Sequence, residues 1–162
     1  MAQKAIYPGT FDPVTLGHID LIKRARRIFS EVIVAVAHNP QKNPLFTVKE
    51  RKEFLKKATS DITGIIIEDF DGLVIDYARR KQVRTLIRGL RMISDFEYEF
   101  QMALTNRKLA SDIETIFLMP HEDYSYLSSK LLKEAVGFGA DISCFVPDFV
   151  YQALKKKVAS SK

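Results

Sequence analysis

The chain has 162 residues, of which 46% are hydrophobic and 28% are charged, a size and balance typical of one globular domain with its own core. A single cysteine, Cys144, excludes an internal disulfide, and no apolar stretch approaches the ~20 residues that a membrane-spanning helix needs. The net charge of +5 suits an anionic ligand but does not distinguish a nucleotide, a phosphorylated metabolite and a nucleic acid. We therefore expect one domain over residues 1–162 and, because the N-terminus lacks the apolar segment of a signal peptide, a cytoplasmic location.

The first element begins with a short apolar run at residues 5–7, which predicts the end of a strand that breaks at residues 8–9. Apolar residues then recur at helical spacing from about Leu16, so Gly17 and His18 fall in the first turn of a helix. Backbone N–H groups and the positive end of the helix dipole point out of such a turn and can hold a phosphate. We expect the two glycines of this stretch to let a ligand approach the backbone, and His18 to donate a hydrogen bond to it. A lone histidine in a first turn is also typical of a surface or capping residue.

Strand and helix patterns alternate over the rest of the chain. Apolar runs predict strands over residues 32–37, 65–67, 85–87 and 116–119. Helices are predicted over residues 47–58, from 73, from a cap at Ser94 or Asp95, from a cap at Ser128 or Ser129, and from Pro147. Five strands alternating with helices predict an α/β, Rossmann-like fold with a five-stranded parallel sheet and helices on both faces.

Two apolar segments carry further expectations. In the helix that follows residue 94, the residues at helical spacing are Phe96, Phe100, Ala103 and Leu104. This spacing indicates a core or a subunit interface rather than a platform for stacking bases. Cys144 lies in the apolar run 142–146, and we expect a buried structural thiol.

Ligands of such folds bind at the carboxyl ends of the strands, near the point where the strand order reverses. The polar residues that follow the five strands should therefore face one site, and they are Gly9, Thr10, Phe11 and His18; His38 and Lys42; Asp71 and Gly72; Arg88, Gly89 and Arg91; and His121 with residues 125–130. This ring combines three strong cations with hydroxyls and helix N-termini, without a Ser-His-Asp set, a metal cluster or a close pair of acids. It indicates a site that holds phosphates.

Each cation of the ring also has a simpler interpretation. Lys42 lies in a polar loop, where a lysine is usually only solvated. Arg88 and Arg91 follow a buried strand and can chelate a phosphate, but they can equally pair with the acidic residues of the segment 95–99. The serines at 128–129 can serve as helix caps alone.

Four strings carry a family resemblance: YPGTFDPVTLGH at residues 7–18, IRGLR at 87–91, DFEYE at 95–99 and YSYLSS at 124–129. The TLGH end of the first string matches the T-x-G-H signature of nucleotidyltransferases related to class I aminoacyl-tRNA synthetases. Together, in this order and spacing, the four strings make the sequence resemble the bacterial phosphopantetheine adenylyltransferases over essentially its whole length. The resemblance implies transfer of AMP from ATP to 4'-phosphopantetheine, giving dephospho-coenzyme A and pyrophosphate, with Mg²⁺ as cofactor.

The resemblance also implies roles for individual residues. His18, Lys42 and Arg91 are the implied catalytic residues, with His18 as transition-state stabiliser. The implied 4'-phosphopantetheine residues are Thr10, Lys42, Val74 and Arg88. The implied ATP residues are Thr10, Phe11, His18, Gly89, Leu90, Arg91, Glu99, Tyr124, Ser125, Tyr126, Leu127, Ser128, Ser129 and Lys130. Lys130 departs from the family, which usually has serine or threonine there, so the role of its side chain is open.

The family implies a homohexamer, leaves open whether coenzyme A binds as a feedback ligand, and implies no nucleic-acid or membrane partner. Because the second pKa of a phosphate monoester is about 6, the acceptor is largely a dianion at neutral pH and needs no general base. Three alternatives stay open: a sister nucleotidyltransferase acting on nicotinamide mononucleotide or glycerol 3-phosphate, a basic nucleic-acid-binding module, and a catalytically silent nucleotide sensor. The dispersed cations argue against the second, and the intact set of candidate catalytic residues argues against the third.

Overall fold

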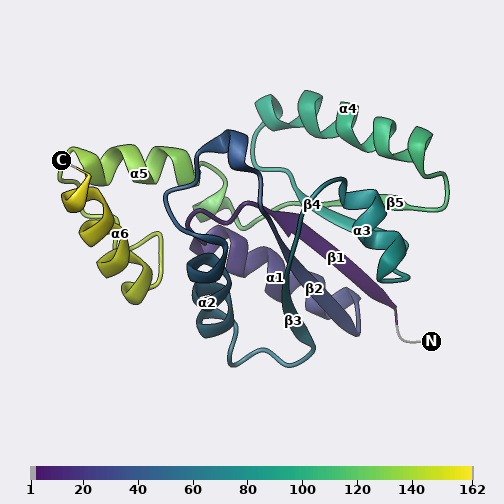
Figure 1. Cartoon of the computed structure of the whole chain (residues 1–162), viewed down its shortest axis with the longest axis horizontal. Coiled ribbons are helices and arrows are strands. Elements are labelled where there is room, and N and C mark those ends of the chain that lie inside the picture. Colours follow the sequence, from purple (N-terminus) through teal and green to yellow (C-terminus); the bar gives the residue numbers. More distant parts are fainter. Residues whose placement is uncertain (1–2, 162) are drawn as a thin grey trace.

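The computed structural model describes residues 3–161. Its strands are all parallel and form one sheet in the order β3-β2-β1-β4-β5 (Figure 1). They are β1 (Lys4–Gly9), β2 (Glu31–Ala37), β3 (Ile65–Phe70), β4 (Thr85–Gly89) and β5 (Glu114–Leu118). The predicted Rossmann-like sheet is confirmed, and its strand order reverses between β1 and β4.

Helices connect the strands and follow the sheet. The α-helices of the described residues are α1 (Leu16–Ile28), α2 (Val48–Ala58), α3 (Val74–Arg80), α4 (Ile93–Leu109), α5 (Ser129–Gly137) and α6 (Asp148–Ser160). Two 3₁₀ turns, η1 (Pro40–Lys42) and η2 (Glu122–Tyr124), lie in the loops after β2 and β5. Figure 1 shows α5 and α6 together at one end of the molecule and α4 along another side.

The central strands β1 and β2 are buried on both faces, because successive residues of each enter different hydrophobic cores. Ala5 and Tyr7 pack into one core with residues of α1, α2, α5 and α6. Ile6 packs into the other core, where its neighbours include Ile75 and Ala78 of α3. This arrangement explains why the strands read as continuous apolar runs rather than alternating ones. The prediction of helices on both faces is therefore confirmed.

The strand β1 does not break at residues 8–9 as predicted. Pro8 and Gly9 continue the strand and pair with Ala35 and Val36 of β2. On the other side, β1 pairs with β4 only at Ile6. Proline has no N–H to donate, so it fits a place where the ladder to one neighbour has already opened. The carboxyl ends of β1 and β4 therefore part at the point where the strand order reverses.

Helix α4 carries the apolar residues for which the sequence left a core and a subunit interface open. Among its residues only Glu99 is buried, and Phe96, Phe100 and Leu104 are each 46% exposed. The expected apolar face exists, but it does not contribute to the core of this chain. Helix α4 also begins at an N-cap, Met92, whose side chain forms no cap hydrogen bond, and not at a cap by Ser94 or Asp95.

Of the remaining local predictions, the helix caps are confirmed and the burial of the cysteine is wrong. The capping box of Thr47 and Glu50 is present, and Ser128 caps α5. Cys144 is exposed, which contradicts the buried thiol that we expected. The run around it forms a turn, so its ends, Ile142 and Val146, are buried while the middle faces outward.

We found no helix within residues 3–161 that combines the length and the apolar character needed to cross a membrane.

Candidate active site

Two adjoining cavities lie at the carboxyl edge of the sheet, where β1 and β4 part. The larger has a volume of about 480 Å³ and lies between the β1–α1 loop, the end of β4 and the N-terminus of α5. The smaller, of about 200 Å³, lies between the ends of β1 and β4, α3 and α4. The wall that the two cavities share consists of Pro8, Gly9, Thr10, Lys42, Arg88 and Glu99. A cavity of the larger size suits a small-molecule ligand.

The structure brings most of the predicted site residues to these cavities. Those that line the larger cavity are Thr10, Phe11, His18, Lys42, Arg88, Gly89, Arg91, Glu99, Tyr124, Leu127, Ser128, Ser129 and Lys130. Val74 lines only the smaller cavity. Leu90, Ser125 and Tyr126 line neither, so roles for them in ATP binding stay predictions.

Four further residues of the predicted ring, His38, Asp71, Gly72 and His121, line neither cavity. His38 instead contacts Asp69, with 2.7 Å between its Nε2 and the carboxylate. Asp71 and Gly72 form a turn of their own, and His121 contacts Asp123. The rule that strand ends share one site therefore fails for these residues, which bond to closer partners, but it holds for Lys42 after β2 and for residues 127–130 after β5.

The T-x-G-H signature forms a capping box in which a histidine takes the place usually held by glutamate or glutamine. The Thr15 N–H donates to Nδ1 of His18 at 3.0 Å, and the His18 N–H donates to the Thr15 hydroxyl oxygen at 3.3 Å. Because Nδ1 accepts a hydrogen bond, the proton of the neutral ring lies on Nε2. Burial, assisted by the positive charges of Arg91 and Arg88, lowers the pKa of His18 to about 3. His18 is therefore a neutral donor at physiological pH.

The glycines of this stretch serve the packing of the protein itself. A Cβ at Gly9 would lie 2.9 Å from the ring of Phe11, and one at Gly17 would lie 3.3 Å from the Cβ of Tyr124. Phe11 has a left-handed backbone with φ of 49°, and its ring packs edge-on against His18. Both glycines also line the larger cavity, so the expected approach of a ligand to this backbone stays a prediction.

Both arginines at the end of β4 form the ion pairs that we left open. Arg88 donates to both carboxylate oxygens of Glu99, at 2.8 and 2.5 Å, and to the Pro8 carbonyl at 2.8 Å. Although burial opposes its charge, the contact with Glu99 raises the pKa of Arg88. Arg91 pairs with Asp95 and donates to the Leu127 carbonyl. Both guanidinium groups also line the larger cavity, so pairing fixes their position without removing them from the site.

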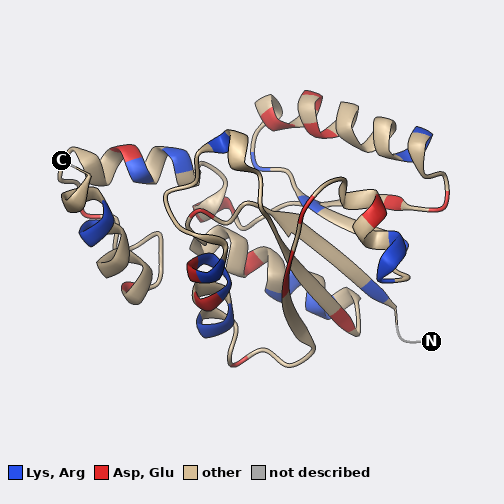
Figure 2. Cartoon of the chain, in the orientation of Figure 1, with Lys and Arg blue, Asp and Glu red and all other residues tan. Residues whose placement is uncertain are grey.

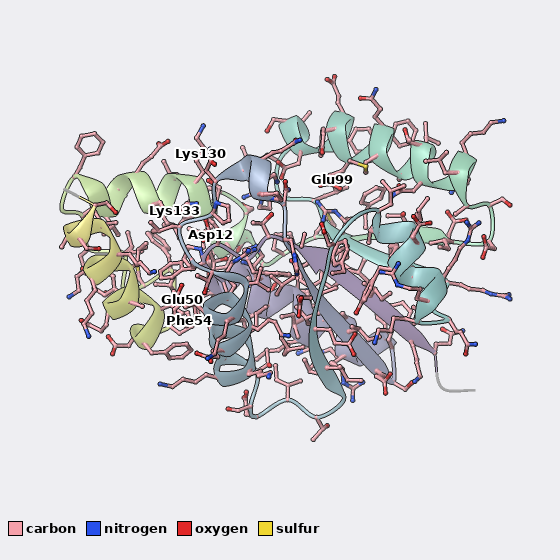
Figure 3. All side chains as sticks on the ribbon, in the orientation of Figure 1. Asp12, Glu50, Phe54, Glu99, Lys130 and Lys133 are labelled. Carbon is pink, nitrogen blue, oxygen red and sulfur yellow. The ribbon has the colours of Figure 1, made fainter. Side chains whose placement is uncertain are left out.

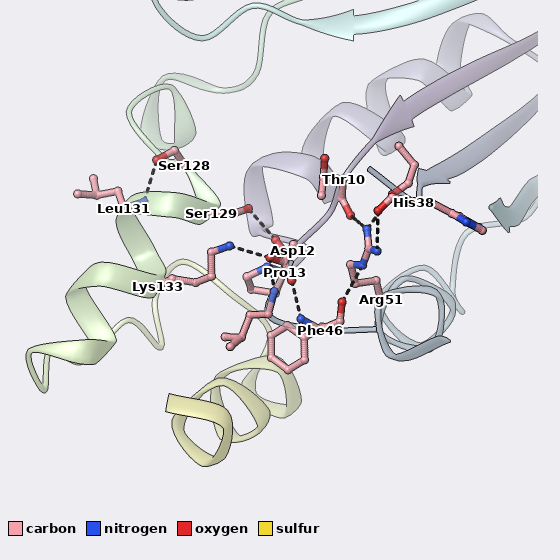
Figure 4. A network of polar contacts seen from close by, with 12 residues as sticks. Thr10, Asp12, Pro13, His38, Phe46, Arg51, Ser128, Ser129, Leu131 and Lys133 are labelled. Atoms are coloured by element: carbon pink, nitrogen blue, oxygen red, sulfur yellow. Dashed lines mark hydrogen bonds and ion pairs between the residues drawn. The ribbon is translucent and has the colours of Figure 1, made fainter. Parts of the chain in front are cut away.

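An ion pair that the sequence did not predict joins the first loop to α5. Asp12 is only 3% exposed, and its carboxylate accepts hydrogen bonds from Lys133 at 2.7 Å and from the N–H groups of Leu45 and Phe46, each at 2.9 Å (Figure 4). Figure 3 shows Lys133 on α5 facing this loop. The pair fixes the N-terminus of α5 beside the β1–α1 loop. Asp12 belongs to the string at residues 7–18, but its partners lie 33 to 121 residues away in the sequence. The pattern of the string alone therefore could not predict the pair.

The described residues contain no group of three or more His, Cys, Asp or Glu that is placed to hold a metal. The carboxylates that line the larger cavity are Asp12, Asp95 and Glu99. Each already pairs with a lysine or an arginine. These three side chains do not fit a site in which protein ligands alone hold a cation.

Comparison with known proteins identifies close relatives. Residues 6–135 match the family model described as Cytidylyltransferase-like. The phosphopantetheine adenylyltransferase of Caldanaerobacter subterraneus subsp. tengcongensis is 55% identical over 97% of this chain and 98% of the relative. That of Alkaliphilus metalliredigens is 55% identical over 94% of this chain and 97% of the relative. A putative nicotinate-nucleotide adenylyltransferase from Vibrio parahaemolyticus, at 18% identity, shares the fold with a TM-score of 0.72 over 98% of this chain and 95% of that chain.

Proposed function

The chain belongs to the cytidylyltransferase-like family and, within it, to the phosphopantetheine adenylyltransferases, and from this membership we propose how its residues perform the reaction. The enzyme transfers AMP from ATP to 4'-phosphopantetheine and releases dephospho-coenzyme A and pyrophosphate. The observation that carries the proposal is the wall shared by the two cavities, which contains Thr10, Lys42 and Arg88. An acceptor phosphate at this wall would meet ATP in the larger cavity.

We assign the smaller cavity to the pantetheine arm. Its lining includes the apolar residues Val74, Phe70 and Met102, together with the amide of Asn106. An apolar lining with a few polar groups suits an arm made of methylene and amide units. The larger cavity, with Arg91 and the N-terminus of α5, suits a triphosphate.

In the proposed step, an oxygen of the acceptor phosphate attacks the α-phosphorus of ATP. A new P–O bond forms as the bond to the β-phosphate oxygen breaks, and pyrophosphate leaves with the electron pair. No proton has to move because the acceptor is already a dianion. Lys42, Arg88 and Arg91 offset the repulsion between the two anions, and Nε2–H of His18 donates to the charge on the α-phosphate.

We propose that Mg²⁺ arrives bound to the phosphates of ATP, where it would offset their negative charge. This fits the cavity, whose carboxylates are taken up by Lys133, Arg91 and Arg88. Mg²⁺ commonly keeps several waters and binds substrate phosphates rather than a cage of protein ligands. The protein's part is to supply cations around the phosphates.

The pH profile should follow the substrate and not His18. We expect kcat/KM to rise with a pKa of about 6 and then stay level, because the acceptor loses its second proton there while His18 stays neutral above its pKa of about 3. The rise of kcat/KM with pH should persist in His18→Asn, with lower rates throughout. Steady-state rates measured on both sides of this pKa test the prediction. If the rise vanished in the variant, the ionisation would belong to His18.

The lowered pKa of His18 should also make the free energy of unfolding depend on pH. The unfolded chain binds a proton at His18 near the ordinary pKa of 6.5, whereas the folded protein binds it only near 3. The contribution of His18 to the free energy of unfolding is therefore lost as the pH falls from about 6.5.

The reaction itself is tested by pyrophosphate release from ATP and Mg²⁺. The acceptors to compare are 4'-phosphopantetheine, nicotinamide mononucleotide, glycerol 3-phosphate and none. We expect release only with 4'-phosphopantetheine. Release with another acceptor would keep the nucleotide site but overturn the acceptor site at Lys42, Val74 and Arg88, and ATP binding without any release would identify a silent sensor.

Competition with 4'-phosphopantetheine tests coenzyme A as a further ligand. Coenzyme A carries the same arm as the acceptor, so we propose that it binds the smaller cavity and competes with 4'-phosphopantetheine. Along the ribbon in Figure 2, lysine and arginine positions are spread over several elements with acidic positions among them, which supports a site for small phosphates over an extended nucleic-acid surface.

We propose that the exposed face of α4 joins subunits of a hexamer. Phe96 and Phe100 stack at 5.4 Å, and exposed apolar residues continue to Leu104 and Leu109. Monomers rarely expose such a face. Six copies of the 18.5 kDa chain should give about 111 kDa by light scattering, and Phe100→Glu should lower that mass. Phe138→Glu, at a residue 93% exposed on the end of α5, is the control that should not.

A further inference from the structure

A buried arginine of α2 contacts the backbone of the loops that form the site. Arg51 is only 1% exposed. Its guanidinium donates to the carbonyls of Thr10 at 2.8 Å, Ala37 at 2.9 Å, His38 at 3.4 Å and Phe46 at 3.1 Å (Figure 4). One side chain thus joins the β1–α1 loop, the end of β2 and the loop that leads to α2. Arg51 lines neither cavity.

The guanidinium is stabilised by carbonyl dipoles and not by a direct ion pair. Within residues 3–161, no carboxylate oxygen lies within ion-pair distance of Arg51. Burial lowers its pKa, and the negative charge of Asp12 opposes that shift. Burying a charge without a direct partner is costly. The buried guanidinium fixes the positions of four carbonyls, which an apolar side chain of the same volume could not do.

These carbonyls bracket the loop that carries Lys42. The loop leaves β2 at His38 and returns at Phe46, both held by Arg51. At the second end, Asp12 also accepts the N–H of Phe46, so that residue is held at both its N–H and its carbonyl. Between the ends, the described backbone–backbone bonds are local, from Lys42 to Asn39 and from residue 43 to residue 40, and the Leu45 N–H donates to Asp12 next to the second end. Lys42 therefore depends on the two ends of the loop for its position.

The carbonyl of Thr10 connects the Lys42 loop, through Arg51, to the β1–α1 loop. Thr10 lies in the β1–α1 loop and lines both cavities, as Lys42 does. Because one rigid guanidinium holds Thr10 and both ends of the Lys42 loop, it sets the spacing between the two groups. A lysine at position 51 would keep the charge but lose the planar fork that reaches several carbonyls at once.

We propose that Arg51 is a positioning residue for the acceptor phosphate, acting through Lys42, whose loop it ties to the Thr10 carbonyl, without touching the substrate. The inference rests on the proposed role of Lys42. Misplacing a binding group by about 1 Å lowers catalytic efficiency by up to about 10²-fold. We expect Arg51→Lys to lower kcat/KM for 4'-phosphopantetheine by about 10-fold or more, while KM for ATP stays within about twofold.

The control is a second buried residue of α2. Leu55 is fully buried one turn further along the helix and takes no part in the four carbonyl contacts, so Leu55→Val should lower stability and leave those contacts in place. At temperatures chosen to leave both variants fully folded, Leu55→Val should keep the KM for 4'-phosphopantetheine. If Leu55→Val raised that KM as much as Arg51→Lys does, the effect would belong to stability and the proposal would be overturned.

A double-mutant cycle separates this inference from the proposed function. In the Lys42→Ala background, Arg51→Lys should change kcat/KM for 4'-phosphopantetheine by no more than about twofold, because the group that it positions is gone. Additive effects would overturn the inference. Lys42→Ala with unchanged kinetics would instead overturn the role of Lys42 in the proposed function. Arg51→Gln gives the same test if the lysine variant does not fold.

Discussion

Replacing His18 with alanine is expected to lower kcat by about 10²–10³-fold, the usual effect of removing one preorganised donor to a transition-state oxyanion. His18 is well prepared for this role, because the Thr15 N–H holds Nδ1 and leaves the proton on Nε2. Its pKa of about 3 keeps the ring neutral, so it donates without changing charge. Rapid-quench measurement of AMP transfer would give the chemical step directly.

Two variants make this result specific. His18→Asn keeps a neutral side-chain donor and should recover part of the lost rate. His121→Ala removes a histidine that is near the loop after β5 but outside both cavities, and it should leave kcat within about twofold of the unmodified enzyme. An unchanged kcat in His18→Ala would falsify the role of this residue in the reaction.

Replacing Arg88 with methionine is the second change with a large expected effect. It removes a proposed ligand of the acceptor phosphate and leaves Glu99, which is 7% exposed, without its bidentate partner. We expect kcat/KM for 4'-phosphopantetheine to fall by about 10²-fold or more, as the loss of a charge-assisted pair predicts. The free energy of unfolding should fall by about 3 kcal/mol because a buried carboxylate loses its cation.

The double variant Arg88→Met with Glu99→Met separates these two effects. It removes both charges, so most of the lost stability should return. Acceptor binding should not return, because no cation replaces Arg88. Urea denaturation and the KM for 4'-phosphopantetheine measure the two quantities. Recovery of both would show that Arg88 acts only as a structural partner of Glu99, and a raised KM for ATP would assign Glu99 to the nucleotide as well.

Features with a local signal could be predicted from the sequence. The order of strands and helices follows from apolar runs and caps, and the capping box at Thr47 is encoded within four residues. The T-x-G-H segment also carries its own geometry, since Thr15 and His18 hydrogen-bond to each other. The placement of Lys42 beside Arg88 follows from the rule on the ends of parallel strands.

The remaining features depend on contacts between distant parts of the chain. The choice of Glu99 over Asp95 as the partner of Arg88 depends on how α4 is oriented relative to β4. Asp12 and Arg51 read as ordinary surface residues in a loop and a helix, yet both are buried by partners that lie far away in the sequence. The predicted burial of Cys144 was wrong for a related reason. An apolar run predicts burial, but it does not predict the turn that exposes this residue.

Helix α4 carries Glu99 on one side and an exposed apolar face with Phe96 and Phe100 on the other. In the hexamer that we propose, a neighbouring subunit covers this face, so the contact between subunits also fixes the helix that holds Glu99. Because Glu99 holds Arg88 by two hydrogen bonds, loss of the subunit contact would shift the arginine that faces the acceptor. Assembly and acceptor binding would then weaken together.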